Sequence, residues 1–189
     1  MDDKILLNKI SKKDEKAFQF FVEKYHKLVL NVCNNILNNY DDAMDISQEV
    51  FIKIYDSVDS FRGESKITTW LYRISVNKSL NLLRSRKKEN RFTSLDVIFG
   101  NGDKKPDPED HELKPGENIE LEENKKALYF ALGKLPEKQK IALSLHNFED
   151  LAYKEISEVM DISVTEVGVL INRGKKKLQK LILNYYEKN

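Results

Sequence analysis

The sequence holds few of the residues that break or cross-link a fold: 7 glycines, 4 prolines and one cysteine among 189 residues. Scarce glycine and proline argue against an architecture of short strands and tight turns, and abundant leucine, isoleucine, lysine and glutamate favour helices. The single cysteine, Cys33, excludes a disulfide framework. Because Cys33 lies in an apolar run, we expect a small buried side chain in a reducing compartment.

Long apolar runs are also missing. No stretch approaches the roughly 20 apolar residues of a membrane-spanning helix, and the N-terminal Met1-Asp-Asp-Lys lacks the pattern of a signal peptide. We therefore expect a cytoplasmic protein. The formal net charge is only +1, so affinity for a polyanion must come from local patches of charge rather than from the whole chain.

Patterns typical of catalysis are absent as well. The histidines His26, His111 and His146 lie far apart in the sequence. They have neither the paired spacing of metal ligands nor a neighbouring nucleophile motif. A helical enzyme is therefore the weakest interpretation, and we expect no catalytic residue, no metal and no other cofactor.

The sequence does contain helical periodicity, in two blocks. In the first, helices are expected from Asp14, from Asp42 to Val58, and from about Thr68 to Lys88. In the second of these helices the apolar residues recur every three or four positions and should face inward: Ile46, Val50, Phe51, Ile54, Tyr55 and Val58. The other side of that helix carries Asp45, Gln48, Glu49 and Ile52.

Between residues 96 and 120 the periodicity stops. Glycines and prolines interrupt any helix there, and carboxylates outnumber lysines, so the composition predicts a flexible acidic linker. Helical spacing then resumes, with Leu135-Pro136 marking a new helix start because proline suits the first turn. The prediction is an all-α fold of two helical domains, residues 1–95 and 121–189, joined by the linker 96–120.

The most informative segment is about 151–171, which predicts two helices joined by a tight turn. Ser163 and Glu166 have the spacing of a capping box, in which the serine oxygen accepts an amide and the glutamate reaches back to the serine amide. Apolar residues then keep helical spacing on one face of the second helix: Val164, Val167, Leu170 or Ile171, Leu178 and Leu181. The opposite face offers Thr165, Glu166, Gly168, Val169, Asn172, Arg173, Lys176 and Lys177. This is the helix-turn-helix arrangement that places a helix in the DNA major groove, although such helices also occur in ordinary bundles.

The segment 61–84 combines aromatic, amide and basic side chains, as single-stranded nucleic acid requires. Trp70 and Tyr72 have the spacing of core residues. A polar strip about one turn apart is harder to explain as scaffold: Asn77, Lys78, Asn81 and Arg84.

Several motifs occur together in one order along nearly the whole chain. They are Asp45-Ile-Ser-Gln-Glu-Val-Phe-Ile-Lys-Ile-Tyr, Phe61-Arg-Gly-Glu-Ser, Thr69-Trp-Leu-Tyr-Arg-Ile, Val76-Asn77, Leu135-Pro136 and the helix-turn-helix. In this combination the chain resembles the extracytoplasmic-function (ECF) sigma factors of bacterial RNA polymerase. The resemblance implies a sigma region 2 domain, which binds the polymerase and the melted minus-ten element, and a sigma region 4 domain, which reads the minus-thirty-five element.

The resemblance also implies roles for individual residues. The helix that would bind the polymerase clamp matches Asp45, Gln48, Glu49, Phe51 and Ile52. Binding of the minus-ten element is implied for Phe61, Arg62, Lys66, Asn77, Lys78, Asn81 and Arg84. Binding of the minus-thirty-five element is implied for Ser163, Thr165, Glu166, Gly168, Val169, Asn172, Arg173 and Lys176. The implied partners are core RNA polymerase (clamp helices of the largest subunit, flap of the second subunit), promoter DNA and an anti-sigma factor, with no small-molecule substrate.

The chain departs from the family pattern at two places. Val169-Leu170 stands where the family commonly has Ser-Arg, and Ala152 replaces the serine that usually caps the first helix of the motif. For the acidic linker two interpretations stay open: a solvated tether, or a segment that enters the polymerase active-site channel. A conventional helix-turn-helix regulator, with a ligand-sensing or dimerising N-terminal domain, is the alternative function. It has no use for the segments 45–55 and 61–84.

Overall fold

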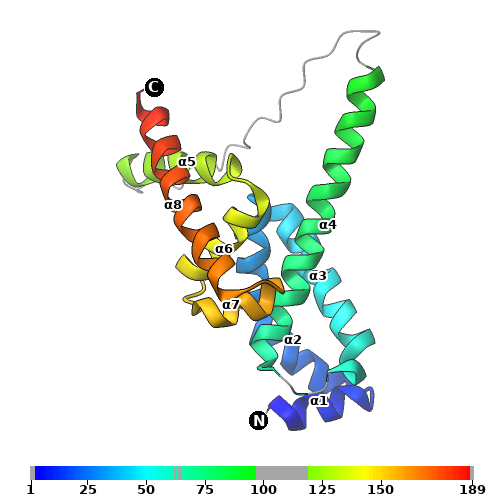
Figure 1. Cartoon of the computed structure of the whole chain (residues 1–189). Helices are drawn as coiled ribbons and strands as arrows, with labels where there is room; N and C mark the ends of the chain where they lie inside the picture. The colour runs from blue at the N-terminus through cyan, green and yellow to red at the C-terminus, as the bar shows by residue number, and fades with distance from the viewer. Residues whose placement is uncertain (1–2, 62, 64, 97–118, 188–189) are drawn as a thin grey trace.

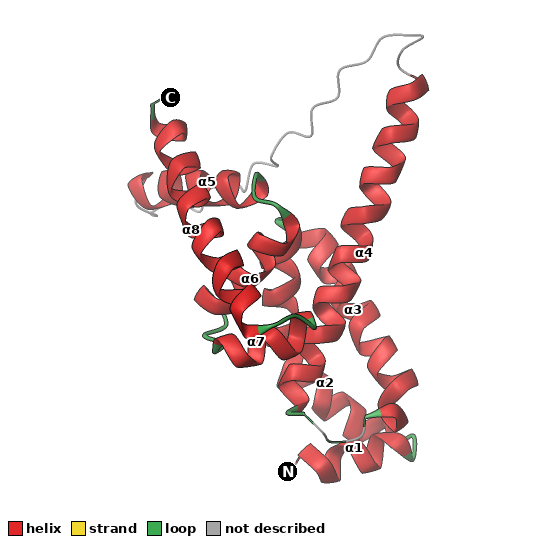
Figure 2. Cartoon of the chain, viewed as in Figure 1, coloured by secondary structure: helices red, strands yellow, loops and turns green. Residues whose placement is uncertain are grey.

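Helices are the only regular elements in the part of the chain that the structure describes (Figure 2). This computed structural model describes residues 3–61, 63, 65–96 and 119–187, with residues 89–96 and 119–122 described by their backbone alone. In chain order the elements are α1 (Asp3–Ser11), α2 (Glu15–Leu37), α3 (Tyr40–Ser57), the 3₁₀ turn η1 (Val58–Ser60), α4 (Ile67–Asp96), α5 (Ile119–Gly133), α6 (Glu137–Asn147), α7 (Tyr153–Met160) and α8 (Val164–Tyr186). The all-α prediction is confirmed. Most of the predicted linker, residues 97–118, lies outside the described residues.

Local capping decides where the helices begin. The Asp14 carboxylate accepts the backbone N–H of Ala17 at 3.0 Å, so α2 starts where the sequence predicts it. Helix α3 starts earlier than expected because the Asn39 side chain accepts the N–H of Asp42 at 2.9 Å and caps it. Helix α4 continues past Lys88 to Asp96. The Leu135-Pro136 signal predicts the start of α6 correctly, although Pro136 is its N-cap residue and lies one position before the first turn.

The first hydrophobic core lies among α1, α2, α3 and α4. Phe21 is fully buried at its centre, with the ring of Tyr25 at 4.9 Å and that of Phe51 at 6.4 Å between centroids. Cys33 is also fully buried, as predicted, and burial raises the pKa of its thiol to about 11. The thiol therefore stays protonated at neutral pH.

A second core belongs mainly to α6, α7 and α8 but is not confined to them. Val32 and Ile36 of α2, and Tyr72 and Val76 of α4, are buried in the same cluster as Ile141, Leu145, Ile156, Val167 and Ile171. The two halves of the chain are thus packed against each other, which the sequence did not predict. Figure 1 shows the C-terminal half lying alongside α2 and α4, with the two chain ends at opposite ends of the molecule.

Helix α6, which contacts both α2 and α8, buries a lysine. Lys140 is 7% exposed, and no described residue forms an ion pair with it. Burial lowers the pKa of its ammonium from 10.5 to about 8. A pKa difference of that size corresponds to a free-energy cost of roughly 3 kcal/mol for keeping the Lys140 ammonium charged in the folded chain at neutral pH.

Replacing Lys140 by methionine is therefore expected to raise the free energy of unfolding by about 1–3 kcal/mol at pH 7, since an apolar chain of similar length fills the same space. The folded pKa lies below the unfolded one, so wild-type stability rises with pH between about 8 and 10.5 and the advantage of Lys140→Met shrinks over that range. Urea denaturation of both proteins at pH 7 and pH 10 measures this. The exposed-site control, Lys126→Met, should change the free energy of unfolding little. A stabilising effect of Lys140→Met that grows with pH would contradict the lowered pKa assigned to Lys140.

Candidate polymerase- and DNA-binding surfaces

One side of α3 is open to solvent and matches the segment assigned to a protein partner. Asp45, Gln48 and Glu49 are exposed, and Ile52 beside them has 61% of its surface exposed, which is unusual for isoleucine. Phe51 differs from the other residues predicted for this surface: only 5% of it is exposed, and it packs on Phe21. It supports α3 from inside and does not form part of the open face.

The open side of α3 is tied to the polar strip of α4. The Lys78 ammonium donates to the Glu49 carboxylate at 2.7 Å, and both groups remain partly exposed. An exposed pair of this kind adds little stability. It does place a residue predicted to bind the polymerase next to a residue predicted to bind DNA.

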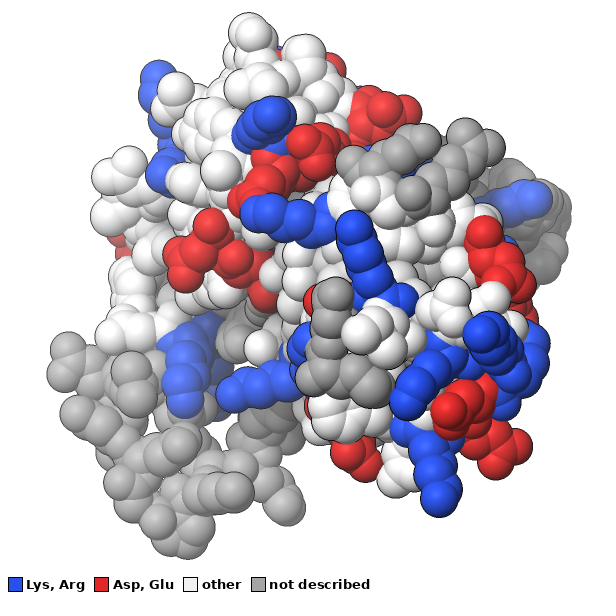
Figure 3. Space-filling model, turned by 90° about the horizontal axis from the view of Figure 1, so that it is seen from below, with Lys and Arg blue, Asp and Glu red and all other residues white. Residues whose placement is uncertain are grey.

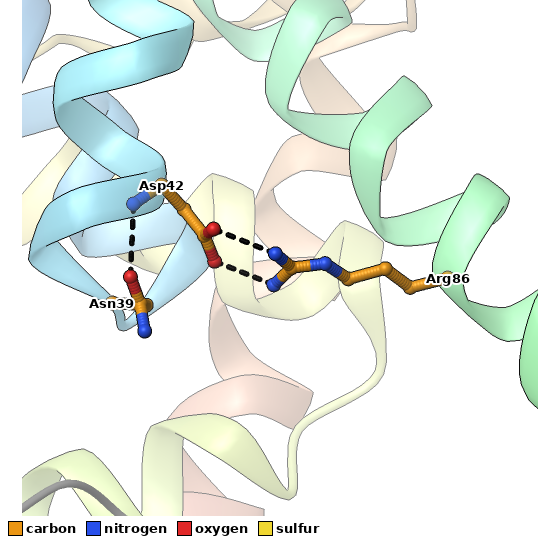
Figure 4. A network of polar contacts seen from close by, with 3 residues as sticks. All are labelled: Asn39, Asp42 and Arg86. Atoms are coloured by element: carbon orange, nitrogen blue, oxygen red, sulfur yellow. Dashed lines mark hydrogen bonds and ion pairs between the residues drawn. The ribbon is translucent and has the colours of Figure 1, made fainter.

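A second and better-shielded link fixes α4 against the start of α3. Both terminal nitrogens of the Arg86 guanidinium donate to the Asp42 carboxylate, at 2.5 and 2.6 Å, while the Asn39 side chain holds the Asp42 backbone (Figure 4). The Asp42 side chain is 15% exposed. A two-pronged contact fixes direction as well as distance, so it sets how the exposed strip of α4 lies relative to the open side of α3.

The loop before α4 presents an aromatic pair. The rings of Phe61 and Trp70 lie 5.0 Å apart between centroids and both are half-buried. Gly63 has φ +72° with no atom near a would-be Cβ, so the turn needs glycine for its backbone and not for space. Arg62, also predicted to bind the minus-ten element, lies outside the described residues. Lys66 follows the loop and is exposed, although its ammonium meets Glu155 of α7 at 2.7 Å.

The predicted strip on α4 is exposed and separate from the core. Asn77, Asn81 and Arg84 are all solvent-exposed and fall on one side of the helix, with Lys78 half-buried beside them. The inward side carries Ser75, whose hydroxyl donates to the Leu71 carbonyl at 2.9 Å. The core assignment of the aromatic residues is confirmed for Tyr72, at 6% exposure, and in part for Trp70.

The helix-turn-helix is present as α7, a turn at Asp161 (φ +54°) and α8. The Ser163 hydroxyl accepts the N–H of Glu166 at 3.1 Å, as predicted. The Glu166 carboxylate lies 3.6 Å from the Lys138 ammonium and not at the Ser163 amide, so half of the predicted capping box forms. At the start of α7 only the reciprocal half exists, because Ala152 has no side-chain acceptor and only its N–H reaches Glu155, at 3.1 Å.

The outer side of α8 forms an open depression. Its lining is Thr165, Gly168, Val169, Asn172, Arg173 and Lys176, which all belong to the predicted DNA-binding set. Ser163 and Glu166 of that set lie at the exposed helix start. The apolar side is confirmed for Val167 and for Ile171, but the prediction for Val164 is wrong: it is 47% exposed because it is the first residue of the helix, beyond the reach of α6 and α7.

One close helix contact was not found from the sequence. Gly174 of α8 is buried, and a Cβ there would lie 3.5 Å from the Gln139 carbonyl of α6. In the sequence the glycine is followed by three lysines. Its signal is its spacing of three and seven residues from Ile171 and Val167, on the buried side of the helix.

Charge on the molecule is local. On the face drawn in Figure 3, lysine and arginine groups lie next to aspartate and glutamate groups, and neither sign covers the whole face. Among the described residues no group of three His, Cys, Asp or Glu side chains is placed to hold a metal ion. The ring of His146 packs at 5.2 Å from Tyr153 and its Nδ1 lies 3.1 Å from the Leu151 carbonyl oxygen. No helix in the described part of the chain is long and apolar enough to cross a membrane.

Comparison with known proteins assigns the two halves to two sigma regions. Residues 21–89 match the family model of sigma-70 region 2, and residues 125–178 match that of sigma-70 region 4. The chain has the fold of a two-region sigma factor. The RpoE sigma factor of Bartonella quintana, solved in complex with the anti-sigma factor NepR, has a similar fold, with a TM-score of 0.67 at 20% identity over 88% of this chain and 97% of that one.

Two curated proteins match along almost the whole length. The ECF RNA polymerase sigma-E factor of Escherichia coli (strain K12) is 33% identical over 96% of this chain and 97% of its own. The RNA polymerase sigma-H factor of Pseudomonas aeruginosa is 32% identical over 95% and 93%. The chain belongs to the ECF sigma factors. As such it is a transcription initiation factor and not an enzyme: it binds core RNA polymerase and directs initiation at promoter DNA.

The two helix starts of the motif give a matched pair of stability predictions. Ala152→Ser supplies the missing acceptor at the N-cap of α7 and should raise the free energy of unfolding by about 1 kcal/mol, whereas Ser163→Ala removes the acceptor of α8 and should lower it by a similar amount. Urea denaturation of both variants measures this. If Ala152→Ser destabilises the protein, the N-cap geometry assigned to α7 is wrong.

Proposed function

We propose that the chain divides promoter recognition between its two halves. Residues 1–95 form region 2, which binds the polymerase and the opened minus-ten element; residues 121–189 form region 4, which reads duplex at the minus-thirty-five element; residues 96–120 link them. The observation that supports this division is how three exposed surfaces are distributed over the two halves. The open side of α3 and the polar strip of α4 belong to one half, and the depression on α8 belongs to the other.

For polymerase binding we assign the open side of α3 to the clamp helices of the largest subunit. Asp45 and Glu49 offer carboxylates and Gln48 an amide for basic residues of a partner, and the exposed Ile52 offers apolar surface to bury. Phe51 acts indirectly by holding the helix in place. Region 4 then meets the flap of the second subunit.

For the minus-ten element we assign the loop 61–66 and the strip on α4. Taking a base out of the stack costs a few kcal/mol, and an aromatic surface such as the Phe61–Trp70 pair can return part of that by stacking. Arg62 and Lys66 are placed in the sequence to hold the neighbouring phosphates. Amides and cations of the strip offer hydrogen bonds to the strand: Asn77, Lys78, Asn81 and Arg84.

For the minus-thirty-five element we assign the depression on α8. Val169 can contact a thymine methyl, Asn172 can read a base edge, and Arg173 and Lys176 can hold phosphates. Ser163, Thr165, Glu166 and Gly168 form the helix start that would enter the groove. We further infer an anti-sigma factor as a regulatory partner, since the Bartonella quintana RpoE of the same fold is held by one. The place of action is the cytoplasm, where polymerase and genome are.

The test of this function is run-off transcription with purified core polymerase, this protein and genomic DNA fragments. We expect discrete transcripts that core polymerase alone does not make. Absence of any new start site would end the proposal. Binding of duplex operators without polymerase, with no transcript, would favour a conventional regulator instead.

Glu49→Lys should abolish association with core polymerase, because it puts a cation where a carboxylate is assigned to meet basic residues. Its helicity should be unchanged, since the side chain is exposed. Co-purification with core enzyme and circular dichroism measure the two. Glu23→Lys, an exposed charge reversal on α2, is the control. Lys78→Met breaks the same ion pair from the other side and should retain polymerase binding. If Glu49→Lys also binds core polymerase as wild type does, the assignment of the open side of α3 to polymerase binding is wrong.

Arg173→Ala should lower transcription from duplex promoters about tenfold at moderate salt and reduce the dependence of binding on salt by about one counterion, because one phosphate contact is lost. Run-off yield across a KCl series measures this. Lys126→Ala removes an equal charge from α5, outside the depression, and should behave as wild type. Equal yields and equal salt slopes for all three proteins would count against α8 as the reading helix.

A further inference from the structure

The depression on α8 has a basic part and an uncharged part. Arg173 and Lys176 line the basic part, and both also line a neighbouring depression together with Gln139, Lys177 and Lys180. Among the described residues that line the two depressions there is no carboxylate. Cations gathered in this way suit DNA phosphates, which position a protein on duplex but carry no sequence information. The choice of bases therefore falls to the uncharged part.

The uncharged part consists of Thr165, Gly168, Val169 and Asn172. Val169 is 41% exposed and offers two methyl groups to whatever enters the depression. Asn172 is exposed as well, and in the described part of the chain no residue hydrogen-bonds with its side chain. Its amide therefore has a donor group and an acceptor oxygen open to a partner. Gly168 adds no side chain that would keep the edge of a base pair away from them.

Val169 and Asn172 lie close enough together to act on neighbouring base pairs. They are three positions apart on one helix, and side chains at that spacing have Cβ atoms about 5–6 Å apart. Successive base pairs of duplex DNA are about 3.4 Å apart. Both residues follow the helix start at Ser163 by fewer than ten positions, in the part of a recognition helix that meets base edges.

The chemistry of the two side chains selects the same kind of base pair. Thymine is the one base with a methyl group in the major groove, and a valine side chain can pack on it. Adenine presents the N7 acceptor beside the N6 amino donor, so an asparagine amide can donate to the first and accept from the second. Guanine presents acceptors at both places, so the Asn172 carbonyl oxygen would face another acceptor.

We propose that the uncharged part of the depression reads two neighbouring A·T pairs. Val169 packs on the thymine methyl of one pair, and the Asn172 amide spans N7 and N6 of adenine in the other. The proposal rests on the function proposed above for α8 and goes further by naming the base pairs and the atoms that are read.

Removing single atoms from the DNA tests the two contacts separately. The probe is the genomic fragment that gives the strongest run-off transcript, and binding is measured with the complex of this protein and core polymerase. Each thymine of its minus-thirty-five segment is replaced in turn by deoxyuridine, which lacks only the methyl group. At one position the wild-type complex should bind about fourfold more weakly, the effect of one buried methyl group.

Val169→Ser should bind the thymine and deoxyuridine duplexes equally, because the hydroxyl of serine gains nothing from the methyl group. Val164→Ser is the matched control. Val164 is a valine of the same helix, 47% exposed, that does not line the depression. The control should keep the wild-type sensitivity to deoxyuridine.

Adenines of the same segment are then replaced in turn by 7-deazaadenine, which lacks the N7 acceptor. Wild type should bind roughly fivefold more weakly, or worse, at one adenine within two base pairs of the sensitive thymine. Asn172→Ala should be indifferent to this change and still sensitive to deoxyuridine. Asn184→Ala, which removes an exposed amide from α8 outside the depression, should behave as wild type.

Each comparison sets two duplexes against each other with one protein, so a general loss of affinity in a variant does not affect it. Three results overturn the proposal: no thymine is sensitive in wild type, a variant stays as sensitive as wild type, or the sensitive bases lie more than two base pairs apart. Discrete transcripts from the parent fragment would then still support the proposed function. If the complex makes no transcript, the proposed function fails and the reading of A·T pairs fails with it.

Discussion

Helix α4 packs against α2 and α3 on one side and against α7 on another, and this double packing governs the rest of the molecule. The first contact is made by apolar side chains of a core that also buries Phe21 and Leu71, and it is fixed in direction by the Arg86–Asp42 fork. The second contact is smaller and more polar. One helix thus contributes to the core of its own half and also contacts the other half.

This difference follows from what each contact removes from water. Residues such as Val50, Ile54 and Leu71 are fully buried between helices of one half, and burying such side chains yields about 1.5–3 kcal/mol each. The contact with α7 instead contains charged groups that would be hydrated in either state. These polar contacts add little net stability because the hydrogen bonds formed replace hydrogen bonds to water.

The elements of the fold were predictable because their signals are local. Asp14 and Ser163 mark helix starts through bonds to amides three residues on, and each side chain makes that bond. Val164 failed because periodicity records the angle of a residue on a helix and not whether another helix reaches its end. Phe51 was predicted both for the inward side of α3 and for its binding side. Its packing on Phe21 places it on the inward side.

The contact between the halves could not be predicted in the same way. Lys66 and Glu155 are 89 positions apart, and Arg73 and Glu158 are 85 apart, so no spacing rule connects them. Each partner looks like an ordinary exposed charge in its own segment. The burial of Lys140 has no local sequence signal either, because nothing near it in sequence supplies a buried anion. Its burial arises from the packing of α6 on α2 and α8. Long-range packing of polar groups therefore leaves no local signal in the sequence.

The two residues Val169 and Leu170, which depart from the family pattern side by side on α8, have different surroundings in the structure. Leu170 is half-buried and packs on the second core, whereas Val169 is 41% exposed and lines the depression on α8. Leucine at 170 therefore provides apolar packing and does not line the depression. Valine at 169 changes that surface itself: two methyl groups stand where a hydroxyl would donate and accept. A methyl group in the major groove is offered by thymine alone among the bases, so sequence preference should differ from that of serine-bearing relatives at the one base pair facing residue 169.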